Sequence, residues 1–78
     1  MAPSVLSVHH RGIDVQILAV TRVDGQTVFG FELWQDGLRL HAARPVYRTA
    51  VSSERGARRF VDDALAAYDA ARAMQAAL

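Results

Sequence analysis

The chain has 78 residues, with 51% hydrophobic and 22% charged side chains, and its nine cations and eight anions leave a net charge of +1. This length suits a single small domain, residues 1–78, of marginal stability, whereas the composition excludes a disordered chain and the balanced charge argues against a strong non-specific nucleic-acid binder. The lack of cysteine excludes a disulfide framework and a thiolate metal site, and without a long apolar run or a signal-peptide pattern we expect a cytoplasmic protein that does not enter a membrane.

Alternation of apolar and polar residues predicts three antiparallel strands in the first half of the chain. The predicted strands are residues 13–20, residues 27–34 and residues 38–42 or 43. The turn signals between them are Asp24-Gly25 and Asp36-Gly37. Residues 1–10 are either a further edge strand, centred on residues 4–8, or a flexible N-terminus. The pattern therefore predicts a β-meander of three strands, or of four.

The register of the strands follows from keeping one face apolar. A three-residue loop, residues 23–25 with Gly25 in the left-handed region, sets Ile17 opposite Phe31, whereas a two-residue turn would leave the phenylalanines on the other face. A two-residue turn at Asp36-Gly37 sets Leu33 opposite Leu40 and Phe31 opposite Ala42. The predicted buried face consists of Val15, Ile17, Ala19, Phe29, Phe31, Leu33, Leu38 and Leu40.

Residues 53–78 predict one long C-terminal helix, because the apolar period changes to about 3.6 residues. Residues 44–51, which contain Pro45, are expected to form a connection, with edge pairing left open. The features expected of the helix are an N-cap at Ser52 or Ser53, Glu54 in the first turn, i,i+4 pairs Glu54/Arg58, Arg58/Asp62 and Arg59/Asp63, and a core-facing stripe of Ala57, Phe60, Val61, Ala64, Leu65, Tyr68 and Ala71. The fold class is thus α+β, with a β-β-β-α order. A helix of this length overhangs the sheet, so its last turns, with Met74 and Leu78, either fray or pack on a partner.

The free face of the sheet holds the candidate interaction surface. The predicted registers place Asp14, Trp34 and Arg39 in one row across the strands, and Gln16, Glu32 and His41 in the next. An exposed tryptophan beside an arginine is typical of interface anchors, and the two side chains could stack. The same residues also form ordinary cross-strand pairs of a solvated sheet, such as Glu32 with His41. The candidate surface is Asp14, Glu32, Trp34, Arg39 and His41.

The sequence contains no catalytic or cofactor signature. His9, His10 and His41 lack the spacing of metal ligands, and no serine stands in the context of a nucleophile. The adjacent carboxylates Asp62 and Asp63 lie on the polar side of the predicted helix, where no cleft is expected to raise a pKa. We therefore expect no enzyme activity, no cofactor, no metal and no small-molecule substrate.

Part of the chain resembles a nucleic-acid-binding family. Residues 52–65 resemble the start of the last helix of double-stranded-RNA-binding domains, with Ser52 and Ala64-Leu65 in matching positions. Where that family holds phosphates with lysines, this chain has Ser53, Glu54 and Arg58, and the family's first helix is missing. The β-β-β-α order is also similar to that of antitoxin-type domains, in topology only. The resemblance implies weak nucleic-acid binding as an alternative function.

The candidate interaction surface on the sheet, the overhanging helix and the lack of a catalytic signature together predict a non-enzymatic protein-interaction or assembly module. We expect a homodimer, or a complex with a protein partner, formed through the outer sheet face or the C-terminal end of the helix. The alternative, nucleic-acid binding, would use the arginines. All nine cations are arginine, which also follows from GC-rich coding, so their identity alone is weak support for phosphate binding. The arginines concerned are Arg39, Arg44, Arg48, Arg55, Arg58 and Arg59.

Overall fold

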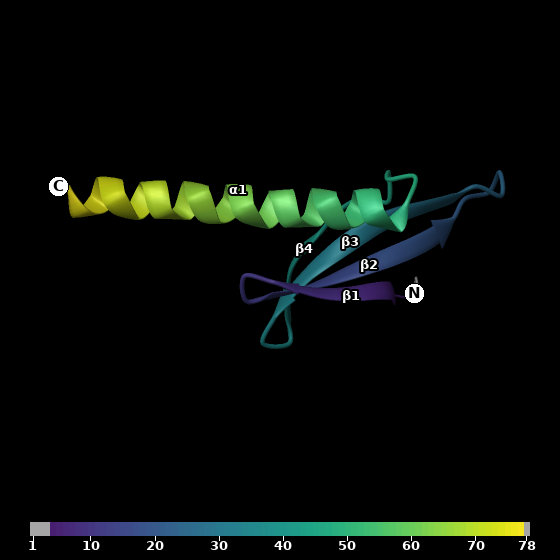
Figure 1. Ribbon diagram of the computed structural model, residues 1–78, viewed down its shortest axis with the longest axis horizontal. Coiled ribbons are helices and arrows are strands. Elements are labelled where there is room, and N and C mark those ends of the chain that lie inside the picture. Colours follow the sequence, from purple (N-terminus) through teal and green to yellow (C-terminus); the bar gives the residue numbers. More distant parts are fainter. Residues whose placement is uncertain (1–3, 78) are drawn as a thin grey trace.

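The computed structural model describes residues 4–77 and shows a four-stranded antiparallel meander followed by one helix (Figure 1). The elements are β1 (Ser4–His10), β2 (Ile13–Thr21), β3 (Thr27–Gln35), β4 (Leu38–Ala42) and α1 (Ala50–Ala76), and the sheet order is β1-β2-β3-β4. The α+β class is confirmed, and the N-terminal segment forms a fourth strand. Residues 1–3 of the predicted N-terminal edge segment, and Leu78 of the predicted helix, lie outside the described residues.

The first long hairpin, β2–β3, has the predicted bulged loop. Arg22 donates its backbone N–H to the carbonyl of Gln26 at 2.7 Å, which leaves residues 23–25 as a three-residue loop. Gly25 has a φ of 88°, a conformation that a residue without a Cβ adopts at low cost. Ile17 therefore lies opposite Phe31, and both side chains point to the same face of the sheet.

The second hairpin, β3–β4, has the predicted two-residue turn at Asp36-Gly37 but a different register beyond it. Trp34 lies opposite Arg39, whereas Leu33 lies opposite His41, so β4 holds one extra residue at Leu40. A bulge of this kind shifts every later side chain of the strand to the other face. The predicted pairings Leu33–Leu40 and Phe31–Ala42 are therefore wrong, and Leu38 and Leu40, predicted to be buried, are 65% and 48% exposed.

The connection between β4 and α1 is hydrogen-bonded to the edge of the sheet, and its first residue, Ala43, donates its backbone N–H to the carbonyl of Phe31 at 2.9 Å. Tyr47 exchanges two backbone hydrogen bonds with Phe29, at 2.7 and 2.9 Å, which settles the edge pairing that the sequence left open. The Tyr47 ring then lies directly against the helix at Gly56, where an added Cβ would overlap the phenol. Glycine at this helical position therefore permits the close approach of the connection to α1.

The helix begins three residues earlier than predicted. Its N-cap is Thr49, whose Oγ1 accepts the backbone N–H of Ser52 at 3.0 Å, so the predicted caps Ser52 and Ser53 are wrong. Ser53 is instead fully buried and donates its hydroxyl to the carbonyl of Gly30 at 2.8 Å. No acidic residue lies in the first turn. Within residues 4–77, Glu54/Arg58 is the one i,i+4 pair of the three expected that lies within ion-pair distance.

The core lies between α1 and the inner faces of β1, β2 and β3, the strands that the helix crosses. Its buried residues are Ile13, Val15, Ile17, Phe31, Leu33, Ala57 and Val61. Phe29 and Ala19, also predicted to be buried, are half-buried, and Phe60 is 41% exposed at the rim. Phe60 of α1 stacks on His41 of β4, with ring centroids 4.1 Å apart.

The C-terminal half of α1 extends beyond the sheet (Figure 1). We call residues 66–77 the overhang, since every one of them is exposed. The molecule measures 54 × 22 × 17 Å and has a radius of gyration of 14.7 Å, whereas about 11.5 Å is expected for a compact chain of this length. The described helix is not long and apolar enough to cross a membrane.

Candidate interaction surfaces

The outer face of the sheet, opposite α1, carries four of the five predicted interaction residues. Asp14 and Arg39 lie opposite Trp34 on its two neighbouring strands, which confirms the first predicted row. Glu32 lies on the same face of β3, opposite Gln16 as predicted, but its partner on β4 is Ala42 and not His41. The second predicted row is therefore only half correct.

Glu32 organises this face by accepting two hydrogen bonds. The Trp34 indole donates Nε1–H to Oε1 at 3.1 Å, and Arg39 donates from Nη1 to Oε2 at 3.2 Å. Both predicted anchors thus bind one carboxylate within the same chain. The guanidinium–ring contact found among the described residues is not between Trp34 and Arg39 but between Arg72 and the Tyr68 ring, at 5.9 Å. Contacts of this kind stabilise a sheet without any partner.

The neighbouring polar groups of the outer face are paired in the same way. His9 Nδ1 lies 2.8 Å from Asp14 Oδ1, and Gln16 is hydrogen-bonded to the hydroxyls of Ser4 and Ser7. The polar part of this face therefore satisfies its own hydrogen-bonding groups. Apolar side chains occupy the end near the β2–β3 loop: Leu18, Val20 and Val28.

His41, the fifth predicted residue, lies on the opposite face of the sheet. The bulge at Leu40 turns it toward α1, where its ring stacks on Phe60 with an interplanar angle of 17° and lies 6.0 Å from the Phe31 ring. The candidate surface predicted from the sequence is thus split between two faces. Nothing in the local sequence of β4 marks the bulge, because Leu38 and Leu40 alternate as a regular strand would.

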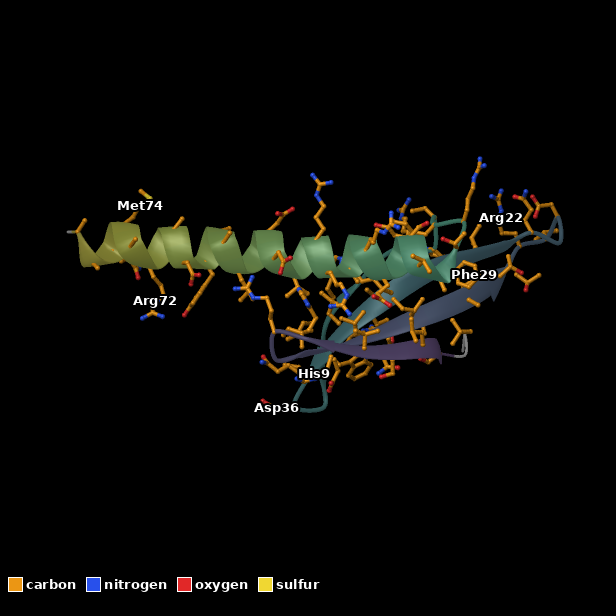
Figure 2. The ribbon with its side chains drawn as sticks, viewed as in Figure 1. His9, Arg22, Phe29, Asp36, Arg72 and Met74 are labelled. Atoms are coloured by element: carbon orange, nitrogen blue, oxygen red, sulfur yellow. The ribbon has the colours of Figure 1, made fainter. Side chains whose placement is uncertain are left out.

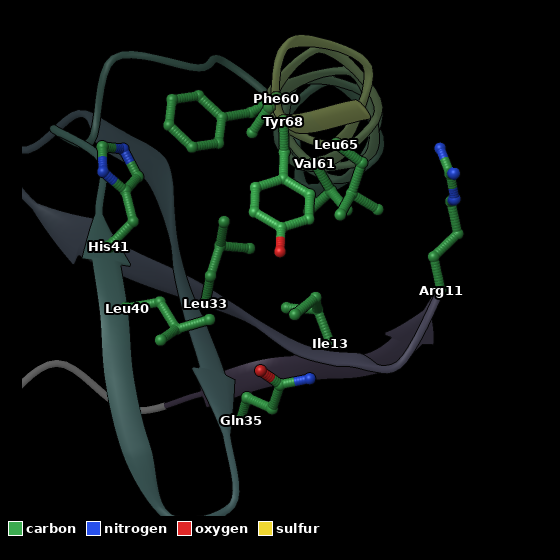
Figure 3. A pocket seen from close by; sticks show the side chains of 11 residues that line it. Arg11, Ile13, Leu33, Gln35, Leu40, His41, Phe60, Val61, Leu65 and Tyr68 are labelled. Carbon is green, nitrogen blue, oxygen red and sulfur yellow. The ribbon is translucent and has the colours of Figure 1, made fainter. Parts of the chain in front are cut away.

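A groove opens on the helix side of the sheet, between α1 and the ends of β2, β3 and β4 near the β3–β4 turn (Figure 3). Its volume is about 400 Å³. Tyr68 points from the helix into the groove, and Phe60 lies beside His41 along one side (Figure 3). The other lining residues include Ile13, Leu33, Leu40, Val61, Ala64 and Leu65. The groove is mostly apolar, which is typical of surfaces that bind an apolar partner.

The groove continues onto the overhang. Tyr68 borders both the groove and a shallow hollow on the overhang that is lined by Ala71, Arg72, Met74 and Gln75. Arg72 extends from the side of the helix that faces the sheet layer, and Met74 extends from the other side (Figure 2). The groove and the hollow adjoin at Tyr68, and we call the two together the helix-end surface.

A polar cluster ties the β1–β2 turn to the middle of α1. His10 Nε2 lies 2.8 Å from Asp62 Oδ1, and Arg11 donates from Nη1 to the same oxygen at 3.2 Å. Arg58 donates from Nη1 to His10 Nδ1 at 3.1 Å. Because a guanidinium can only donate, Nδ1 must be the acceptor, which places the imidazole proton on Nε2 facing Asp62. The cluster therefore fixes one tautomer of His10.

This cluster also shifts the titration of Asp62. The hydrogen bond from His10, followed by the one from Arg11, holds the pKa of Asp62 below its ordinary value of 3.8. A carboxylate with a lowered folded-state pKa stabilises the fold above that ordinary value, and the contribution is lost as the pH falls through the lower folded value.

Replacing Asp62 with asparagine is therefore expected to lower the melting temperature at about pH 7, by an amount that shrinks as the pH falls below 3.8. Thermal unfolding followed by circular dichroism, from about pH 7 to below pH 3.8, measures the melting temperatures of the variant and of the wild type. Asp63→Asn is the matched control, because Asp63 makes no ion pair within residues 4–77, and its melting temperature should follow that of the wild type. A gap between Asp62→Asn and wild type that stays constant down to acid pH would contradict the assignment.

No group of three histidine, aspartate or glutamate side chains that could hold a metal ion occurs among residues 4–77. No family model, no curated protein and no solved structure matches the chain. The described residues thus offer two candidate contact surfaces, the outer sheet face and the helix-end surface.

Proposed function

We propose that the domain is a non-enzymatic assembly module that forms a homodimer through the helix-end surface. The observation that supports this most directly is the area that the monomer exposes. The chain has 5761 Å² of solvent-accessible surface, whereas a compact monomer of 8.5 kDa is expected to expose about 4,700 Å². The excess is roughly 1,100 Å², and a stable protein–protein interface needs about 800 Å² from each partner.

The helix-end surface contributes to this exposed area. The overhang is exposed throughout, and the groove beside it leaves Phe60, Leu40 and Tyr68 41%, 48% and 60% exposed. Apolar side chains that share one continuous surface favour burial against a partner. The helical part of the overhang, residues 66–76, is ~17 Å long, and a helix of this length is marginal in water unless it packs against another surface.

The outer sheet face supports a homodimer less well. Its tryptophan and its neighbouring arginine are both engaged by Glu32, and the other polar groups of its row are paired within the chain. A partner that bound there would have to replace these hydrogen bonds with equivalent ones, because an unpaired buried polar group costs about 1–3 kcal/mol. Of the two contact surfaces expected from the sequence, the helix end is therefore the one that we propose.

The proposal predicts that thermal stability depends on protein concentration. Association adds about 2.7 kcal/mol when a binding partner is at a hundred times its dissociation constant, which corresponds to roughly 10 °C or more in melting temperature for a domain of this size. We expect the melting temperature to rise between ~1 and ~100 µM protein. A melting temperature that is identical across this range would contradict a homodimer whose formation stabilises the fold.

Weak nucleic-acid binding is a second candidate, favoured by four arginines. Among the described residues, Arg44, Arg48, Arg55 and Arg59 have no carboxylate within ion-pair distance, whereas Arg39 and Arg58 are bound to Glu32 and Glu54. Electrostatic contacts with phosphates are strongest at low salt. A titration with short DNA and RNA duplexes at about 50 mM salt tests the candidate, and the absence of binding there would remove it.

A further inference from the structure

We infer that the two copies pack their overhangs antiparallel, with the two-fold axis passing between Ala70 and Ala71. This inference rests on the proposed homodimer and adds its geometry. In this arrangement the end of each helix enters the groove of the other copy. The occupant of the groove is thus a second copy of the same chain.

The sheet leaves room for a second helix beside the overhang. Under the first half of α1 the layer next to the helix is occupied by β1, β2 and β3, whereas the overhang projects past the end of this layer (Figure 1). Packed helices lie 8–10 Å apart, close to the ~10 Å between packed layers in sheet proteins. A helix from a second copy therefore fits in the layer of the sheet, and a two-fold axis lets each overhang fill the space beside the other.

The spacing of residues along α1 supports a helix–helix seam on this side. Positions that alternate in steps of four and three residues stay on one side of a helix that packs against another. The series runs from the buried core into the overhang as Ala57, Val61, Ala64, Tyr68, Ala71 and Gln75. Tyr68 lies in the groove and Ala71 and Gln75 in the hollow. The core-facing stripe thus continues onto the overhang, where Ala71 is its one small residue.

Charge selects the antiparallel orientation. The overhang carries two charged residues, Asp69 and Arg72, and Asp69 lies one turn before Arg72. An axis between Ala70 and Ala71 places Asp69 of each copy opposite Arg72 of the other, which forms two symmetric opposite-charge pairs. A parallel pair in register would instead place each charge opposite its own copy, and such like-charge contacts are unfavourable.

The same axis determines what reaches the groove. It places Gln75 of one copy within about two residues, or ~3 Å along the helix, of the position opposite Ala64 of the other. Ala64 lines the groove. The last turn of one helix therefore lies against Ile13, Leu33 and Leu40 of the other copy, the residues that form the floor of the groove (Figure 3).

Disulfide cross-linking tests this geometry directly, because the chain contains no cysteine and each introduced thiol is unique. A disulfide needs Cα atoms within about 7 Å. Ala71→Cys should cross-link to its own copy, and Ala64→Cys should cross-link to Gln75→Cys in a mixture of the two variants. Ala64→Cys alone should not, because its two copies would lie ~20 Å apart along the helices. Ala66→Cys, on the opposite side of α1, is the control.

We expect Ala71→Cys and the Ala64→Cys/Gln75→Cys mixture to oxidise to covalent dimers at least about tenfold faster than Ala64→Cys or Ala66→Cys alone. Self-linking of Ala64→Cys as fast as Ala71→Cys would indicate a parallel pair and overturn the inference. Each variant is also sedimented under reducing conditions. A reduced dimer without the expected cross-links would overturn the antiparallel geometry and leave the homodimer standing, whereas a reduced monomer would overturn both.

Discussion

Replacing Phe31 with alanine is expected to lower the free energy of unfolding by about 3–5 kcal/mol, the usual loss for a phenylalanine removed from a core. Phe31 is 2% exposed, and its ring lies 6.0–6.2 Å from the rings of His41, Tyr47 and Phe60. The cavity would therefore open where the sheet, the connection and the helix meet. A domain of 78 residues has a total stability of only about 4–12 kcal/mol, so the variant should lose at least about a quarter of it.

The matched control is Phe60→Ala, which makes the same substitution at a ring that is 41% exposed. Its loss should be about 1 kcal/mol, from stacking on His41 and partial burial. Urea unfolding of both variants in dilute solution, where the monomer predominates, gives the two values. Equal losses for Phe31→Ala and Phe60→Ala would contradict the placement of the core between α1 and β1–β3.

The second large effect is expected for Ala71→Glu, which should convert the dimer into a folded monomer. The substitution places two carboxylates next to the two-fold axis, where they would be desolvated without a partner and would repel each other. We expect the dissociation constant to rise at least about a hundredfold, the equivalent of 2.7 kcal/mol. Because Ala71 is exposed in the monomer, the circular dichroism spectrum should keep its helical and strand signals.

Ala66→Glu is the matched control for this effect. It introduces the same side chain into the same exposed segment, but on the side of α1 that faces away from the sheet layer. Size-exclusion chromatography with light scattering should find a dimer for Ala66→Glu and a monomer for Ala71→Glu at the same concentration. If both variants remain dimeric, the contact between copies does not involve the seam that contains Ala71.

The β2–β3 hairpin was predictable because local and long-range patterns agree there. The alternation in β2 and β3 and the glycine at position 25 both require the same bulged loop, since any other register would separate Ile17 from Phe31. The helix was predictable for a similar reason: one apolar stripe continues through Ala57 and Val61 into the core.

The parts that could not be predicted depend on contacts distant in sequence. The bulge at Leu40 turns His41 toward Phe60, a ring on α1 that the pattern of β4 does not reveal. The N-cap depends in the same way on Ser53, which can serve as a cap in any isolated peptide but is used here to satisfy the carbonyl of Gly30. Thr49, four residues earlier, caps the helix instead.

The candidate surfaces, too, were predictable where they follow from strand register and not where they depend on contacts distant in sequence. The row of Asp14, Trp34 and Arg39 follows from register alone and was predicted. The sequence could not show that Glu32 binds both predicted anchors, because this depends on side-chain conformations across two strands. The groove was also missed, although Phe60 and Tyr68 stood in the predicted helical stripe, because its other wall is formed by the shifted β4.

Sedimentation equilibrium of the unmodified protein at micromolar concentrations measures the mass of the associated species. A homodimer gives a species of twice the chain mass of 8.5 kDa that dissociates on dilution. A single species of 8.5 kDa at every concentration up to ~100 µM would contradict a homodimer built on the overhang and the groove.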